Sequence, residues 1–359
     1  MPRLRVSVKR LREGMVVMED VYAKTGVILV MEGTCVTKEV IGLLTKHFIE
    51  EVIVEYSNDK RRVMNPVKTT EPADKEKQFD AFKTEFVVAE HALSDNFKEI
   101  VYQSRDVDMP ALLGLLNGML EKMDDDAPLT DMLLRMKQQR SGLYAHSINV
   151  ALFGQLLARW IGCSQEEIEL VSAAGLLHDI GFLELWKNNP EQDEFGMDFE
   201  TEKYEKHVIC GYNIVKNQDV DSRVKQAVLT HHEYVNGDGF PLHVSGENIN
   251  KISRIIAIAD TYDMLTMARE GTSGNAVFQA IKKMQEDGYG KLDSTFLLVF
   301  LERIAETMIQ RRVLLNDGRE ARVIMIDKYR LFAPLVQVDG VFVDLAKQNR
   351  LSIKEVLED

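Results

Sequence analysis

The sequence predicts a mainly α-helical protein with a small β-rich module at each end. Three observations support this fold class. Apolar residues recur at helical spacing from about residue 81 to 310, residues 4–56 alternate short strand-like runs with turns, and a hairpin signal follows at residues 316–318. We therefore expect a β-rich N-terminal module at 1–57, a linker at 58–80, a helical domain at 81–310 and a β-rich C-terminal module at 311–359.

The first two segments differ in composition. Residues 4–56 hold strand-like runs such as LRVSV, VILVMEGT and EEVIVEY around one helical stretch, TKEVIGLLTKHF. Residues 58–80 hold two prolines and many charges but few large apolar side chains, which is typical of a linker.

Length and charge limit the classes of function. The chain has 359 residues, of which 45% are apolar, and a net charge of −13, so it can bury a large core but would repel DNA or an anionic membrane over most of its surface. Its three cysteines at unrelated spacings fit a reducing compartment. No apolar run approaches the roughly 18 residues needed to span a bilayer. We expect a cytoplasmic protein without a membrane span or a DNA partner.

One helix carries clear start and stop signals. In SQEEIELVSAAGLLHDIG, Ser164 and Glu167 form a candidate capping box, and Gly181 is a candidate C-terminal stop. This helix would present His178 and Asp179 at its end.

Histidines and aspartates cluster in the helical region. Five of the eight histidines fall between residues 146 and 232: His146, His178, His207, His231 and His232. Val224, Val228 and His231 follow helical spacing, so His231 points inward while His232 lies about 100° round the helix. Neighbouring histidines can thus reach two centres a few ångströms apart.

Taken singly, these residues have ordinary explanations. An inward histidine is more often a hydrogen-bonded core residue, and Asp260, at the end of the apolar run RIIAIAD, could cap a helix or pair with an arginine. His207 lies four residues before Gly211, which leaves space for a close neighbour or a ligand. The HD and HH pairs together favour a joint role, because this mix of donors suits two first-row metal ions and neither calcium nor a zinc-thiolate site.

These motifs resemble the HD superfamily of metal-dependent phosphohydrolases and, within it, the HD-GYP cyclic di-GMP phosphodiesterases. The match runs in family order through YAHSINVALFGQLLARWIG, AAGLLHDIG, HVICGYNIV, HHEYVNGDGFP and IIAIADTYDMLT, over roughly residues 130–310. The resemblance implies an all-helical HD-type domain, two divalent ions that are iron or manganese, and hydrolysis of cyclic di-GMP to pGpG, which family members often cleave further to GMP.

The resemblance also implies roles for individual residues. The metal ligands would be His146, His178, Asp179, His207, His231, His232 and Asp260, with Asp179 bridging two ions. The catalytic roles would belong to His178, Asp179 and His207. The dinucleotide would contact Arg269, Gly237, Gly239 and Pro241.

The chain departs from the family pattern at several positions. Phe182 stands where the family has a lysine after HDIG, and Thr272 stands where a lysine usually follows Arg269. Gly142 replaces the glutamate of trinuclear members, so we expect a binuclear site. The loop reads GFP rather than GYP, with Asn236 where aspartate is commoner.

Three functional hypotheses follow. The first is a binuclear phosphodiesterase acting on cyclic di-GMP. The second is a slow or inactive cyclic-dinucleotide receptor that signals to a diguanylate cyclase partner through the GFP loop, which the absent lysines at Phe182 and Thr272 favour. The third is a di-iron oxygen-dependent oxidoreductase. A homodimer formed through residues 81–130 is a further expectation.

Overall fold

The computed structural model describes residues 4–8, 11–12, 15–22, 28–30, 34, 36–47, 49, 51–55, 72–120, 126–187, 202–267, 277–348 and 350–357. They form two compact units, Met1–Lys75 and Glu76–Asp359. In the described parts of the chain, no helix combines the length and the apolar character needed to cross a membrane.

The described residues of the N-terminal unit form a small antiparallel β structure with one α-helix. β5 (Glu51–Glu55) pairs with β1 (Leu4–Ser7) and β2 (Val16–Val17), while β3 (Val21–Tyr22) pairs with β4 (Ile28–Val30). Helix α1 (Lys38–Lys46) is capped by Thr37, whose side chain accepts a hydrogen bond from the Val40 amide. The β-rich module predicted from the sequence is therefore present.

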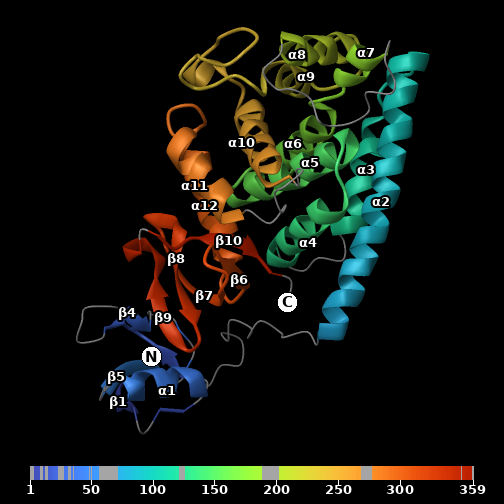
Figure 1. The fold of residues 1–359 in the computed structure, drawn as a ribbon. Coiled ribbons are helices and arrows are strands. Elements are labelled where there is room, and N and C mark those ends of the chain that lie inside the picture. The colour runs from blue at the N-terminus through green and yellow to red at the C-terminus, as the bar shows by residue number, and fades with distance from the viewer. Residues whose placement is uncertain are drawn as a thin grey trace. The chain divides into compact units, whose positions relative to one another are not determined.

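The second unit is mainly helical (Figure 1). Its α-helices are α2 (Pro72–Gln103), α3 (Met109–Leu120), α4 (Asp126–Gln139), α5 (Leu143–Trp160), α6 (Gln165–Leu177), α7 (Phe182–Trp186), α8 (Glu202–Val215), α9 (Ser222–Thr230), α10 (Lys251–Thr266), α11 (Val277–Asp287) and α12 (Ser294–Glu306). Helix α2 begins inside the segment expected to be a linker. Proline is well tolerated in a first helical turn, and Phe79, Phe82 and Phe86 bury one face of the helix.

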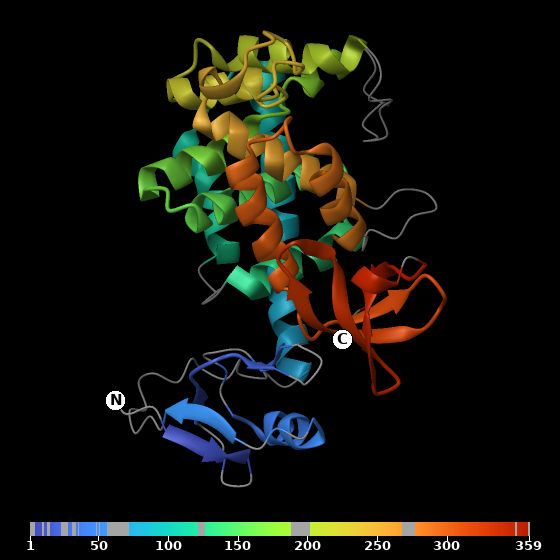
Figure 2. The same ribbon diagram turned by 90° about the vertical axis from the view of Figure 1, so that its left-hand side faces the viewer.

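The C-terminal residues form one antiparallel sheet that packs against α11 and α12 (Figure 2). Its order is β10-β6-β7-β8-β9, from β6 (Arg312–Leu315), β7 (Glu320–Asp327), β8 (Arg330–Val338), β9 (Val341–Asp344) and β10 (Ile353–Val356). The predicted hairpin turn joins β6 to β7, with Gly318 at φ 88°. Val313, Val323 and Val336 join the same apolar core as the helices. The sheet expected at 311–359 is thus integrated with the helical unit.

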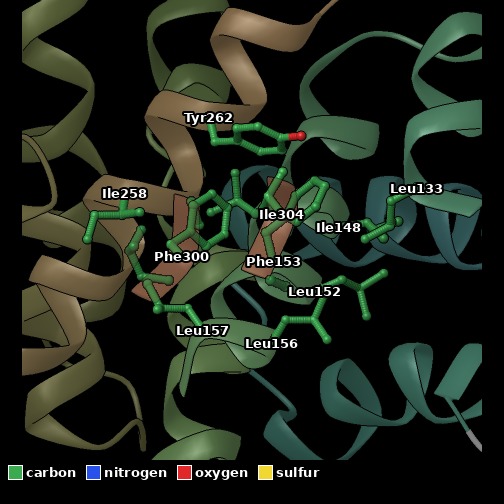
Figure 3. Close-up of a cluster of buried hydrophobic side chains, with 14 of the residues drawn as sticks. Leu133, Ile148, Leu152, Phe153, Leu156, Leu157, Ile258, Tyr262, Phe300 and Ile304 are labelled. Atoms are coloured by element: carbon green, nitrogen blue, oxygen red, sulfur yellow. The ribbon is translucent and has the colours of Figure 1, made fainter. Parts of the chain in front are cut away.

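Helices α5, α10 and α12 meet in an aromatic core (Figure 3). The Phe153 ring packs edge-on against Tyr262 and Phe300, at centroid distances of 5.1 Å and 6.2 Å. A Cβ on Gly175 would overlap the backbone of Ala151, so α5 and α6 approach closely there. This packing holds three of the segments that carry predicted ligands.

Helix α6 starts as predicted but ends earlier. Ser164 and Glu167 form the capping box, and the helix ends at Leu177 rather than running to Gly181. Gly181 begins α7 instead, at a place where a Cβ would overlap the backbone of His207 and Gly211. The space expected beside His207 is therefore taken by a close backbone neighbour.

Candidate metal centre

The structure brings all seven predicted ligands together. They lie on α5 (His146), directly after α6 (His178, Asp179), on α8 (His207), at the end of α9 (His231, His232) and on α10 (Asp260). Each is buried, and the most exposed, His232, retains 9% of its surface. Burying so many polar groups is costly unless they bind one another or an ion.

The seven residues form two groups of candidate metal donors. One group contains His146, His178 and Asp260, and the other contains Asp179, His207, His231 and His232. Within each group, one ligand atom per residue lies within 4.8 Å of the others. The arrangement therefore offers two neighbouring sites.

Asp179 faces both groups. Its Oδ2 lies 3.5 Å from Nε2 of His146 and 3.3 Å from Nε2 of His178. Its Oδ1 lies 3.2 Å from Nε2 of His207 and 3.6 Å from Nε2 of His231. One carboxylate oxygen toward each group is the geometry of a bridging ligand.

Backbone carbonyls define the tautomers of three histidines. Nδ1 of His178 lies 2.7 Å from the Gly175 carbonyl, and Nδ1 of His231 lies 3.1 Å from the Val228 carbonyl. Nδ1 of His207 is likewise bound to a backbone carbonyl, that of Tyr204. A carbonyl can only accept, so each Nδ1 carries a proton, and Nε2 is the nitrogen that faces the site and can bind a metal ion through its lone pair.

Acceptor atoms consequently converge in the second group. Nε2 of His207 and Nε2 of His231 lie 3.3 Å apart, and both face Oδ1 of Asp179. Burial lowers the pKa of His231, with contributions from neighbouring histidines, so its ring stays neutral. Converging lone pairs repel one another unless a cation lies among them. The residues therefore fit a metal ion.

In the first group, His146 holds a proton when no metal ion competes for its position. Nε2 of His146 lies 3.1 Å from Nε2 of His178 and 3.2 Å from Oδ1 of Asp260. Burial disfavours the imidazolium, but hydrogen bonds to Asp260 and Asp263 raise the pKa of His146 to about 10. Metal binding at this group must displace that proton.

Sequence reasoning missed three side chains around the centre. Asp263 Oδ2 lies 2.8 Å from Nδ1 of His146, Lys137 Nζ lies 2.7 Å from Asp263 Oδ1, and the Tyr204 hydroxyl lies 3.2 Å from Nε2 of His232. Asp263 follows Asp260 by three residues on one helix, a spacing that could have signalled a shared face. Lys137 had no such signal, because lysine is rarely buried.

Phe182 packs against a predicted ligand. Its side chain is 2% exposed, and its ring stacks on His207 at a centroid distance of 4.4 Å and on Trp186 at 5.4 Å. The position that holds a lysine in the family thus restrains the His207 ring through an apolar contact.

The GFP loop folds back onto the histidine pair. The Phe240 amide donates to the His232 carbonyl at 3.2 Å, and the Phe240 ring stacks on His232 at 4.8 Å. A Cβ on Gly239 would overlap the backbone of His232 and Tyr234. The buried Glu233 accepts the amide of Leu242 at 2.6 Å and that of Val244 at 3.1 Å.

Of four remaining positions singled out in the sequence, two are described by the structure and two are not. Gly142 precedes α5 at φ 113° and Gly237 lies in the loop at φ 85°, both in the region that favours glycine. Arg269 and Thr272 lie outside the described residues.

Comparison with known families identifies this part of the chain. Residues 129–296, which contain all seven predicted ligands, match a family model described as an HD domain. This segment is an HD domain.

The HD domain has relatives among bacterial phosphodiesterases. Cyclic di-GMP phosphodiesterase PdeB of Borreliella burgdorferi is 28% identical over 57% of this chain and 55% of its own length. Cyclic di-GMP phosphodiesterase PA4108 of Pseudomonas aeruginosa is 28% identical over 57% of this chain and 50% of its own. 3'3'-cGAMP-specific phosphodiesterase 3 of Vibrio cholerae is 29% identical over 41% of this chain and 32% of its own. The chain spans about half the length, or less, of these relatives.

Proposed function

We propose that the protein is a binuclear metal-dependent phosphodiesterase that hydrolyses cyclic di-GMP to pGpG and then to GMP. The observation that carries this proposal is the convergence of His207 Nε2, His231 Nε2 and Asp179 Oδ1 in a buried site. The HD domain and relatives named for cyclic dinucleotide cleavage support it. A cytoplasmic location is part of the same proposal.

The proposed chemistry divides between the ions and the chain. When bound, two divalent ions, which we propose to be iron or manganese, would supply an activated water and would neutralise charge on the phosphate oxygens. The chain supplies the donor atoms. Asp179 turns one oxygen toward each group. Hydrogen bonds from Nδ1 to backbone carbonyls hold His178 and His207 with Nε2 facing inward. We assign the catalytic roles to these three residues.

The proposed substrate contacts are Arg269, Gly237, Gly239 and Pro241. Of these residues, the three in the loop are described by the structure. The loop lies directly beside the proposed metal ligand His232, because the Phe240 ring stacks on the His232 ring. We infer that the loop borders the bound dinucleotide while it holds His232 in place.

Phe182 favours a second candidate function. A buried ring stacked on His207 provides no positive charge for a substrate phosphate. A chain with this substitution suits a slow enzyme, or a receptor that binds cyclic di-GMP and signals to a diguanylate cyclase through the GFP loop. Leu242, next to Pro241, is 55% exposed and available for such a contact. The homodimer through residues 81–130 also remains a proposal.

The test is a cleavage time course on anaerobically purified, metal-loaded protein. Cyclic di-GMP, 3'3'-cGAMP and pGpG are supplied separately, and the products are resolved over time. We expect pGpG to appear first and GMP later. Binding of cyclic di-GMP without cleavage at full metal loading would establish the receptor, and consumption of dioxygen with an organic substrate would establish the oxidoreductase.

A further inference from the structure

A lysine is buried in the helical core behind the metal centre. Lys137, on α4, is 3% exposed, and its Nζ lies 5.3 Å from the ring centroids of both Phe153 and Tyr262. Figure 3 shows these two rings packed together among aliphatic side chains, with Leu133, one helical turn before Lys137, nearby. An ammonium in such surroundings is costly to bury unless it is paired.

The partners of Lys137 lie on α10. Its Nζ lies 2.7 Å from Oδ1 of Asp263 and donates to the Asp263 carbonyl at 3.1 Å and to the Thr266 hydroxyl. The Asp263 side chain is fully buried, and its second oxygen, Oδ2, lies 2.8 Å from Nδ1 of His146. Each carboxylate oxygen therefore has its own partner, on α4 and on α5.

The hydrogen bond at Nδ1 distinguishes His146 from His178, His207 and His231. Backbone carbonyls hold Nδ1 of His178, His207 and His231, whereas a side chain performs this task for His146. A carboxylate partner at Nδ1 orients an imidazole and strengthens it as a metal donor. A free carboxylate beside the centre could instead swing round and bind the metal itself.

We propose that Lys137 and Asp263 are positioning residues that hold His146 in its metal-binding orientation. This inference rests on the proposed function, since it assumes that His146 binds a metal ion. Asp263 accepts the Nδ1 proton of His146, so that Nε2 faces Asp179 and Asp260. Lys137 holds the other oxygen of Asp263, which keeps this carboxylate out of the metal site and balances its charge.

The test separates positioning from stability by replacing the ion pair with apolar residues. Lys137→Met alone leaves a buried carboxylate without its cation and is expected to unfold at a lower temperature. Lys137→Met/Asp263→Leu removes both charges and should recover thermal stability in the metal-free full chain. Although its stability recovers, the double variant should bind Mn²⁺ about 10- to 100-fold more weakly than wild type in chelator competition. At limiting free metal it should hold one ion where wild type holds two.

Thr266→Val is the matched control. It removes a contact of Lys137 without touching His146, so we expect a lower unfolding temperature with Mn²⁺ affinity unchanged. Wild-type Mn²⁺ affinity in the folded double variant would overturn the positioning role. If the double variant does not fold, Mn²⁺ binding is measured on Asp263→Asn instead. Weakened binding in this folded variant supports the positioning role, and unchanged binding refutes it. If wild type itself binds no Mn²⁺ or Fe²⁺, the proposed function fails.

Discussion

Nε2 of His207 and Nε2 of His231 lie 3.3 Å apart and share Oδ1 of Asp179 as a neighbour. Both rings bind a backbone carbonyl through Nδ1, so both turn Nε2, the nitrogen that can bind a metal ion, toward this point. A cation between them would stabilise such buried, converging donor atoms. The predictions below follow from this relationship and from the packing that maintains it.

Asp179→Ala should abolish both metal retention and phosphodiester cleavage. The variant loses the carboxylate that offers one oxygen to each donor group. Metal content measured by mass spectrometry and a cyclic di-GMP cleavage assay check this. His91→Ala, on the exposed side of α2, should change neither quantity. Two retained ions and full activity in Asp179→Ala would show that the ligand assignment is wrong.

Gly239→Ala should destabilise the protein and weaken metal binding together. The added Cβ would overlap the backbone of His232 and Tyr234, and overpacking of this kind costs about 1–3 kcal/mol. Gly114→Ala on α3 meets open space and should stabilise by roughly 0.5–1 kcal/mol. Urea unfolding of both variants gives the comparison. Equal stability of Gly239→Ala and wild type would contradict the described loop packing.

Phe182→Leu should loosen the His207 ring. It removes the stacked contact at 4.4 Å, which we expect to lower the free energy of unfolding by about 0.5–1.5 kcal/mol and also to lower metal affinity. Phe86→Leu, which removes an aromatic contact with Phe82 on α2, should lower stability alone. Chelator competition measures the metal affinity of both variants. A metal affinity of Phe182→Leu equal to that of wild type would argue against a restraining role for Phe182.

The start of α6 should make stability depend on pH. The hydrogen bond from Lys251, with a second from the Ser164 amide, lowers the pKa of Glu167 below its ordinary value of 4.5. A group with a lowered pKa in the folded protein adds stability above its unfolded pKa and loses it as the pH falls through the folded value. Acid should therefore reduce the free energy of unfolding more in wild type than in Glu167→Gln. Parallel pH profiles in urea unfolding would count against this coupling.

Much of the fold left a local trace in the sequence. The capping box at Ser164 and Glu167 and the hairpin at residues 316–318 were predicted from short patterns and are present. The HD and HH pairs favoured a joint role, the family resemblance supplied the full set of seven residues, and the structure places these residues together. The start of α2 at Pro72 was hidden, since the charges before Phe79 resemble those of a linker.

The supporting residues of the site were out of reach for a physical reason. Lys137 meets Asp263 only in the folded chain, where α4 packs on α5 and the lysine side chain reaches α10, and nothing in its own segment distinguishes it from a surface lysine. The stacking of Phe182 on His207 likewise depends on how α7 meets α8. Such contacts are tertiary, so local patterns do not encode them.

Metal counting on the anaerobically purified full chain tests the central claim most directly. Elemental analysis per mole of protein, before and after loading with Fe²⁺ or Mn²⁺, gives the stoichiometry. The two donor groups predict two ions per chain in wild type and a loss of ions in His231→Ala. A loaded wild-type chain that binds no metal, or the same metal content in both proteins, would contradict the account.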